Sequence, residues 1–248
     1  MPTLQSTTLA LALIAASHIT VRCIRPPNAT TTSHAENRPN DKGGQEKPRD
    51  RIRFITGLLP LLGAHFVRLA FFYQAITVLL WTGSPRDAFY LSHICPGRQN
   101  LDPAILTWSA TSILSLLAIA SGGALRLSAY GGLGPNFTFH LAQPDQLITD
   151  GVYGYLQHPS YSGLALIEAG TVPLILRWDA AAAGCWMDEW MQEQVAGKGM
   201  VLVGLGVIVT GLFITVRVRD EERMLWERFG KVWEDWHART ARFAPGLW

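Results

Sequence analysis

Five stretches of the chain are apolar for long enough to cross a lipid bilayer, and polar segments separate them. They cover residues 4–24, 54–81, 103–127, 162–178 and 199–216. A membrane-spanning helix needs about 20 mostly apolar residues. The pattern therefore predicts an all-α, polytopic membrane protein with about five transmembrane helices. In the last stretch, Gly204, Gly206 and Gly211 would let a neighbouring helix pack closely.

The same pattern divides the chain into four parts. The first stretch has the length of either a signal sequence or a spanning helix, but no Lys or Arg precedes it, as a signal peptide requires. We therefore expect an N-terminal membrane helix over 1–24. Residues 25–53 are rich in polar residues, Pro and Gly, which predicts a disordered linker. Two transmembrane helices follow in 54–127, and 128–248 forms the part with the candidate chemistry.

Composition supports a membrane protein and excludes other classes. The chain is 48% hydrophobic and 16% charged, whereas soluble domains carry about 25% charged residues. A net charge of +2 is too small to indicate nucleic acid as a partner. The three cysteines, Cys23, Cys95 and Cys185, are far apart and lack metal or redox spacing. We expect them to be small buried apolar residues, with neither a disulfide framework nor a metal site.

The basic residues predict which side of the membrane each segment faces. Residues 25–53 and 217–242 carry seven Lys or Arg each. The loops of the opposite side carry four in total, namely Arg86, Arg98, Arg177 and Lys198. Cytosolic segments are enriched in Lys and Arg. The linker, the segment around residue 151 and the C-terminal tail are therefore expected in the cytosol, where the glycosylation motifs at Asn28 and Asn136 would go unused.

Residues 151–163 (GVYGYLQHPSYSG) lie between two of the apolar stretches and are rich in groups that bind small polar ligands. They contain three tyrosines, one histidine, two serines and three glycines, and glycine lets backbone approach a ligand closely. Pro159 favours a helix start directly after His158. A plain connector does not need this density of aromatic and polar groups, so we interpret the stretch as a site.

The tail supplies a second group of candidate residues. Apolar side chains recur there at helical spacing, which predicts an amphipathic surface helix; they are Leu225, Phe229, Val232, Trp233 and Trp236. Gly230 is expected to break this helix in two. Arg217 and Glu221 share one helix face, but Arg before Glu is the weaker order for a stabilising pair. Their position where the last span ends favours a functional role.

Together these residues resemble the isoprenylcysteine carboxyl methyltransferase family, integral membrane enzymes of the endoplasmic reticulum. The family motifs correspond here to Leu147-Ile148-Thr149-Asp150-Gly151-Val152-Tyr153, Gln157-His158-Pro159-Ser160-Tyr161-Ser162-Gly163, Arg217, Glu221-Glu222, Phe229-Gly230, Trp233, Trp236 and Ala244-Pro245-Gly246. The resemblance covers roughly residues 130–248. Two positions depart from it: Gln157 replaces the usual arginine, which removes a cation near the methyl donor's carboxylate or the membrane interface, and Gln146 replaces a histidine.

The resemblance implies S-adenosylmethionine as methyl donor and the α-carboxylate of a C-terminal prenylated cysteine as acceptor. Arg217 would hold the acceptor carboxylate and, with Glu221, form the catalytic pair. The donor would lie in a cytosolic pocket between the loop before the membrane hairpin and the tail. Its expected residues are Asp145, Gln146, Leu147, Ile148, Tyr153, His158, Pro159, Ser160, Tyr161, Glu221 and Glu222. The expected partners are prenylated proteins and the bilayer, and no metal is implied.

Two other functions stay open. A phosphatidylethanolamine N-methyltransferase would share the donor site but would need an acidic group near its amine acceptor, so Arg217 weighs against it. A non-catalytic membrane scaffold would keep the fold without turnover. Gln146 and Gln157 favour the scaffold, whereas Tyr153, His158, Tyr161 and Glu221 argue for an enzyme.

Overall fold

The structure is a computed structural model that describes residues 2–25, 58–81, 84–134, 137, 144–195 and 197–246. Almost all of the predicted linker 25–53 lies outside these residues, as do Asn28 and Asn136.

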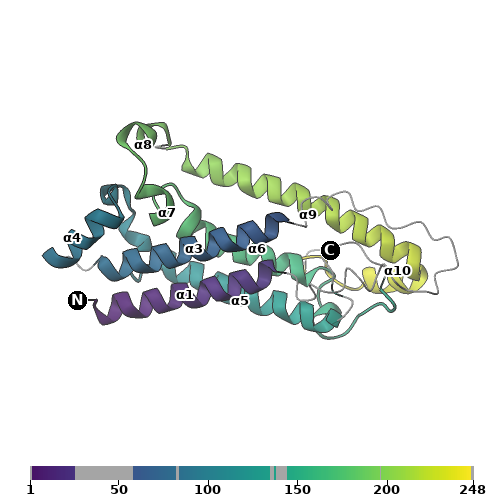
Figure 1. Cartoon of the computed structure of the whole chain (residues 1–248). Helices are drawn as coiled ribbons and strands as arrows, with labels where there is room; N and C mark the ends of the chain where they lie inside the picture. The colour runs from purple at the N-terminus through teal and green to yellow at the C-terminus, as the bar shows by residue number, and fades with distance from the viewer. Residues whose placement is uncertain are drawn as a thin grey trace.

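Long helices run side by side along the molecule (Figure 1). Those long and apolar enough to cross a membrane are α1 (Leu4–Ile24), α3 (Leu58–Leu80), α5 (Ala110–Leu133) and α9 (Gly199–Phe229). Within the described residues, the one pairing of β type is an isolated bridge between Leu156 and Ala241. The prediction of an all-α polytopic membrane protein is thus confirmed.

The fourth apolar stretch folds differently from the other four. It forms α6 (Pro159–Thr171), which continues directly into η5 (Val172–Leu176), a π-helical turn. Pro173 lies in this turn and has no backbone N–H to continue the α-helical hydrogen bonds. By itself α6 is too short to count as a spanning helix. Among the described residues, four helices are long enough, and α6 with η5 makes a fifth apolar segment.

The third span begins later than the sequence predicted. Helix α5 starts at Ala110, where Ser109 and Ser112 form a reciprocal capping box. The preceding Pro103–Ile105 forms a separate 3-10 turn, η2, whose N-terminus is capped by Asp102. Two strong capping signals within ten residues therefore divide a segment whose hydropathy reads as one run.

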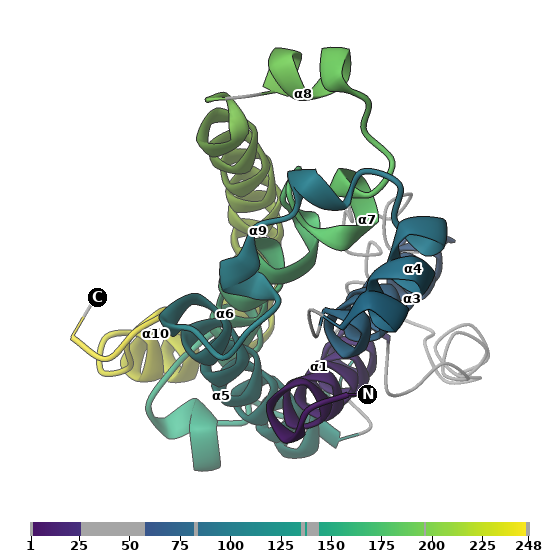
Figure 2. The same ribbon diagram turned by 90° about the vertical axis from the view of Figure 1, so that its left-hand side faces the viewer.

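Short elements gather at the end of the bundle where α1 begins and α3 ends (Figures 1 and 2). They include α4 (Pro85–Ile94), η1 (Arg98–Asn100), η2, α7 (Ala181–Gly184) and α8 (Glu189–Val195). A disulfide joins Cys95 to Cys185 across 90 residues of sequence, whereas Cys23 is buried and free. The expectation of no disulfide was wrong, because only the folded bundle brings the α3–α5 loop against the loop before α8. We call this end the disulfide end.

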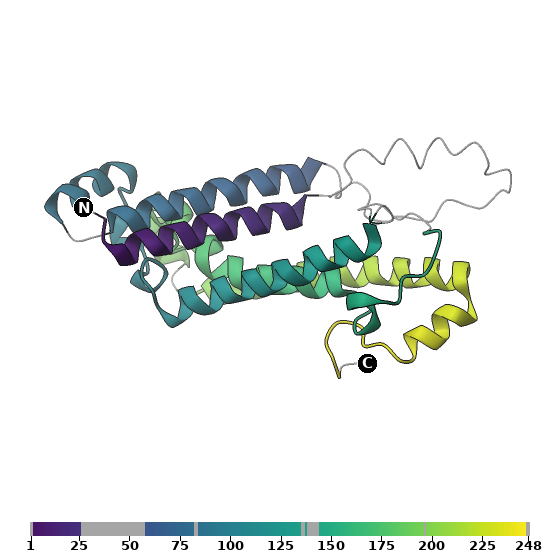
Figure 3. The ribbon, with the colours of Figure 1, turned by 90° about the horizontal axis from the view of Figure 1, so that it is seen from below.

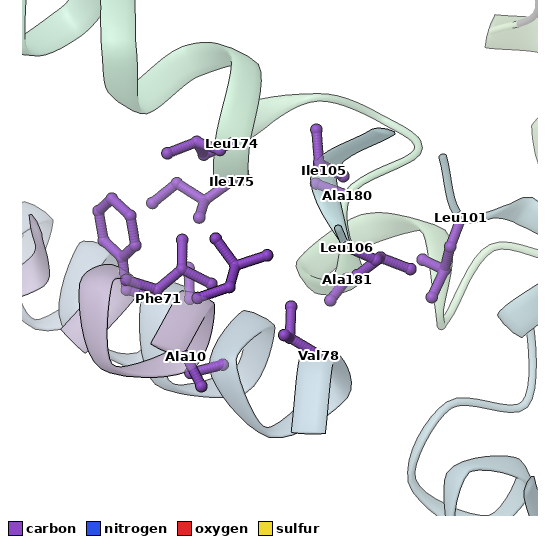
Figure 4. Packing of buried hydrophobic residues seen from close by; sticks show 14 of the residues in the cluster. Ala10, Phe71, Val78, Leu101, Ile105, Leu106, Leu174, Ile175, Ala180 and Ala181 are labelled. Atoms are coloured by element: carbon purple, nitrogen blue, oxygen red, sulfur yellow. The ribbon is translucent and has the colours of Figure 1, made fainter. Parts of the chain in front are cut away.

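The main core fills the space between α1, α3, η5 and α7 (Figure 4). Phe71 and Val78 of α3 and Leu174 of η5 are fully buried there. Gln74 is also fully buried, and its amide donates to Ile105 O at 3.2 Å and accepts from Ala181 N at 3.0 Å. A buried polar group is costly unless it is hydrogen-bonded, and here Gln74 fixes α3 to the disulfide end.

Close glycine packing occurs between α5 and α6, not at α9. A Cβ atom at Gly163 would lie 2.7 Å from Gly122 O, so these two helices need both glycines. By contrast, nothing lies within 4 Å of a Cβ at Gly204, Gly206 or Gly211. The expectation for those three glycines was wrong. Only 11% of the most apolar part of α9 is buried, so no described helix packs closely against these glycines (Figure 2).

Helix α9 extends 13 residues past its predicted end, from the apolar half into the charged tail. It stops at Gly230, whose φ of +52° favours glycine, and α10 (Lys231–His237) folds back from there (Figure 3). The predicted break at Gly230 is confirmed. The C-terminal part of α9 thereby meets the start of α6 at the end opposite the disulfide, which we call the site end.

Candidate functional site

The stretch singled out in the sequence folds as a short 3-10 turn, η4 (Gly151–Gly154), followed by the start of α6. Tyr153 is 6% exposed; its hydroxyl donates to Ala129 O at 3.3 Å, and its carbonyl accepts from Trp236 Nε1 at 3.1 Å. Burial raises the pKa of Tyr153, so its phenol stays neutral at physiological pH. Tyr153 therefore links η4 to α5 and α10.

His158 is the residue before α6, with Pro159 in the first helical position. Its imidazole, 6% exposed, donates from Nε2 to Glu222 Oε1 at 3.1 Å, and its Nδ1 lies 3.8 Å from Glu221 Oε2. Both carboxylates belong to α9. The site stretch and the tail, about 60 residues apart in sequence, therefore meet at this histidine.

Glu221 is the second point of contact between these elements. Its Oε1 accepts from the Tyr161 hydroxyl at 2.7 Å and from Arg217 Nε at 3.0 Å. Arg217 is 5% exposed, whereas the Glu221 side chain is 24% exposed. The carboxylate thus orients a buried guanidinium and keeps access to solvent. We call His158, Tyr161, Arg217, Glu221 and Glu222 the charged cluster.

Arg242 adds a cation to the cluster, although in the sequence it had no predicted role beyond the positive charge of the tail. Its Nη2 donates to Glu222 Oε2 at 2.6 Å, so the two oxygens of Glu222 bind His158 and Arg242 separately. The Arg242 side chain is 44% exposed. The one available signal was its position three residues before the Pro245-Gly246 turn of the tail.

Gln157, where the family resemblance expects arginine, binds the tail. Its amide nitrogen donates to the carbonyl oxygens of Thr240 and of His237, the latter at 3.0 Å, and its Oε1 accepts from His237 Nδ1 at 2.7 Å. Burial lowers the pKa of His237, which favours this neutral pairing. The side chain of Gln157 therefore fixes the C-terminal segment.

Arg126 was not predicted from the sequence as a site residue. It lies beside the charged cluster and holds Ser160, the residue before Tyr161. It is 6% exposed on α5; Nε donates to Cys23 O at 2.9 Å, and Nη1 donates to both Ser160 O and Ser160 Oγ at 2.8 Å. A guanidinium presents several donors in one plane. Arg126 thereby joins α1, α5 and the first turn of α6. The signal available in the sequence was that Arg126 is a charged residue within an apolar span, four residues before Tyr130.

The other predicted site residues lie around the charged cluster. Pro159 is fully buried, and Ser160 is held by Arg126. Leu147 and Ile148 are half-buried against the cluster of Ala129, Tyr153, Trp233 and Trp236. Asp145 and Gln146 are exposed on the loop before η4. The structure thus joins five predicted residues directly, places Tyr153, Leu147, Ile148, Pro159 and Ser160 in neighbouring elements, and leaves Asp145 and Gln146 on the exposed loop.

The charged cluster offers groups suited to a small ligand that carries both a positive and a negative charge. Carboxylates with partial solvent access can face a cationic ligand, and a guanidinium can hold a carboxylate through paired donors. The tyrosines provide ring faces that attract a cation. Among the described residues, no group of three or more His, Cys, Asp or Glu is arranged to hold a metal ion.

Two comparisons with known proteins give matches over parts of the chain. Residues 113–191 match the model of the isoprenylcysteine carboxyl methyltransferase family, a segment that includes α6 and His158 but ends before Arg217. A protein-S-isoprenylcysteine O-methyltransferase of Dictyostelium discoideum is 26% identical over 150 residues. This alignment covers 58% of the chain and 53% of that relative, so the chain spans about half the length of the curated relative it matches. Both matches are to the isoprenylcysteine carboxyl methyltransferase family, so the chain is similar to members of this family over part of its length.

Proposed function

We propose that the protein transfers a methyl group from S-adenosylmethionine to the C-terminal α-carboxylate of prenylated cysteine in proteins. The observation that carries the proposal is the charged cluster, in which a buried arginine and two carboxylates meet the His-Pro-Ser-Tyr turn at one end of a membrane bundle. The Dictyostelium relative bears the name of this activity, and the family match covers the histidine half of the cluster.

The donor supplies an electrophilic methyl group on a sulfonium centre. His158, Tyr161, Glu221 and Glu222 are the residues we propose to hold it, with Tyr153, Leu147 and Ile148 beside them. Glu221 and Glu222 place negative charge where a cationic ligand is favoured, and the 24% exposure of Glu221 leaves it accessible. Asp145 and Gln146 would complete the pocket from the exposed loop.

Arg217 is the proposed group for the acceptor. A carboxylate is already ionised at neutral pH, so the reaction requires placement and charge control rather than a general base. The planar guanidinium suits a carboxylate, and Glu221 fixes its orientation through Nε at 3.0 Å. Because Arg217 is 5% exposed, an acceptor carboxylate bound there would be shielded from water, which strengthens its attraction to the guanidinium.

The apolar half of α9 supports a lipid-modified substrate. Its side chains are largely exposed, and they include Val207, Ile208, Val209, Leu212 and Phe213. In a membrane this surface would contact acyl chains, so a prenyl group could move along it and reach Arg217 on the same helix. A lateral approach between spans is the route we propose.

We further propose that the protein resides in the endoplasmic reticulum membrane with its site end in the cytosol. Positive residues are concentrated in the segments expected at that end. The Cys95–Cys185 disulfide lies at the opposite end, and disulfides persist in oxidising compartments such as the lumen of the endoplasmic reticulum. Charge and disulfide thus favour the same orientation.

The proposal is tested by methyl transfer from labelled S-adenosylmethionine in membranes that contain the protein. An S-farnesylated cysteine analogue and phosphatidylethanolamine serve as the two acceptors. We expect base-labile methyl ester on the prenylcysteine, lost in Arg217→Ala and retained in Arg223→Ala, a matched change at an exposed arginine of the same helix. Methylated lipid instead would favour the N-methyltransferase, and no transfer together with no donor binding would favour the scaffold.

A further inference from the structure

The tail after α10 returns to the site as an extended segment. Gln157 N donates to Ala241 O at 2.8 Å, and His158 N donates to Arg242 O at 3.0 Å. The first of these bonds belongs to the parallel bridge between Leu156 and Ala241, and the second continues the pairing by one residue. The backbone of Arg242 is therefore fixed beside His158, so its side chain starts at the edge of the charged cluster.

Position 157 itself provides no cation and no accessible side chain. Gln157 is 5% exposed, and its amide is occupied by the carbonyl oxygens of His237 and Thr240 and by His237 Nδ1. Any positive charge for an anionic part of the ligand must therefore come from another residue near His158.

Arg242 meets this requirement. It is 44% exposed, in contrast to Arg217 and Arg126, which are 5% and 6% exposed. Its contact with Glu222 Oε2 places a cation and an anion side by side; the guanidinium stays accessible to solvent, whereas the Glu222 side chain is 11% exposed. An α-amino acid zwitterion carries the complementary pair of charges, an ammonium and a carboxylate, on adjacent groups. Because the Arg242 side chain is 44% exposed, its contact with the buried Glu222 is partly solvated and adds less to stability than a fully buried pair would.

We propose that Arg242 binds the α-carboxylate at the amino-acid end of the methyl donor, while Glu222 faces its α-ammonium group. This rests on the proposed function, since it assumes that S-adenosylmethionine is the donor. In this chain the tail thus supplies the cation that Gln157 does not. Arg242 is a binding residue for the donor and leaves the acceptor to Arg217.

The test compares two ligands that differ in the zwitterion. S-adenosylhomocysteine carries the amino-acid end, whereas 5′-methylthioadenosine lacks it and keeps the nucleoside and sulfur. Affinities of both are measured by calorimetry on purified protein, for the natural chain, Arg242→Gln and Arg239→Gln. Arg239 is a matched control, because it is an exposed arginine of the same tail whose Nε donates to Asp235 O of its own helix turn.

We expect Arg242→Gln to weaken S-adenosylhomocysteine about tenfold or more, the scale of a lost charge-assisted hydrogen bond. Methylthioadenosine should bind within about twofold of the natural chain, since it has no carboxylate to lose. Arg239→Gln should change neither affinity. Arg242→Lys should retain part of the difference, because it keeps the charge and loses the planar fork.

Other results overturn the inference. Equal weakening of both ligands would mean that Arg242 only holds the tail in place, and unchanged affinities would remove it from the donor site. A raised KM for the prenylcysteine acceptor with unchanged S-adenosylhomocysteine affinity would assign Arg242 to the acceptor. If the natural chain binds no S-adenosylhomocysteine, the proposed function fails as well. Unchanged S-adenosylhomocysteine affinity and unchanged transfer in Arg242→Gln would reject this inference alone.

Discussion

The two ends of the bundle contain the same kinds of charged residues in different surroundings. At the disulfide end, Arg177 donates to Asp102 at 2.9 Å and to Asp179 at 2.8 Å, and Asp102 also caps η2 through Ala104 N. At the site end, Glu221 and Glu222 are shared among two arginines, a histidine and a tyrosine. The first group cross-links the loops at its end of the bundle. The second group joins side chains of α6, α9 and the tail.

This difference separates structural roles from ligand binding. The carboxylates of the disulfide end cap and cross-link backbone segments that a disulfide also joins, so their hydrogen bonds are used within the protein. The groups of the site end come from three segments distant in sequence, and Glu221 and Arg242 remain 24% and 44% exposed. Arg177 and Asp102 are 29% and 25% exposed as well, so the site end differs chiefly in the number of distant segments that converge there. We therefore expect mutations at the two ends to affect different properties.

The largest effect is expected from Glu221→Gln. The change removes the charge that orients Arg217 and faces the donor, so methyl transfer should fall about 100-fold or more, equivalent to about 3 kcal/mol of transition-state stabilisation. The melting temperature should change little. Transfer to S-farnesylated cysteine measures the first, and thermal unfolding in detergent the second. Glu227→Gln, at an exposed position of α9, is the control; equal losses in both variants would contradict a specific role.

Next in size is the loss of the disulfide. Cys95→Ser combined with Cys185→Ser should lower the free energy of unfolding by about 3 kcal/mol, since the bond closes a long loop. Methyl transfer by the folded protein should be unchanged, because the bond lies at the opposite end. Thermal unfolding with and without reductant is the measurement, with Cys23→Ala as control. If reductant leaves the melting temperature of the natural chain unaltered, the cross-link is not stabilising.

Arg177→Met should have a smaller effect on stability. It leaves Asp102 and Asp179 without their shared cation, and the loss of one member of a partly buried group should cost about 2 kcal/mol, discounted because Arg177 is 29% exposed. Thermal unfolding checks the cost, and kcat/KM should be retained. Arg86→Met at an exposed position is the matched control. A loss of methyl transfer without a loss of stability would mean that Arg177 acts in function, and it would contradict the distinction between the two ends.

The smallest expected effect concerns pH and the docked tail. Burial lowers the pKa of His237 below its ordinary value of about 6.5. The undocked imidazole therefore takes up a proton more readily, so docking weakens as pH falls through about 6.5 toward the folded pKa, by less than about 1 kcal/mol. Hydrogen exchange of residues 238–243 at pH 7.5 and 5.5 measures this. The pH difference should disappear in His237→Gln, and its persistence there would point to another group.

Local patterns were enough to predict much of the architecture. Hydropathy gave the apolar segments, and Gly230 gave the break between α9 and α10. Helical spacing predicted that Arg217 lies beside Glu221, and in the structure Arg217 Nε is 3.0 Å from Glu221 Oε1. Each of these depends on residues within a few turns of one another. Their roles toward donor and acceptor stay predictions.

Contacts between distant segments depended on the tertiary structure. Cys95 pairs with Cys185, Arg126 reaches Cys23 and Ser160, and Arg242 reaches Glu222, each across a turn or a membrane segment. Hydropathy and spacing carry no information about which helices are neighbours. The sequence by itself therefore determined the apolar segments, their polar ends and the two stretches that form the candidate site. The packing of α5 on α6 and the return of the tail decided which charged groups face one another, because only folding brings them within hydrogen-bond distance.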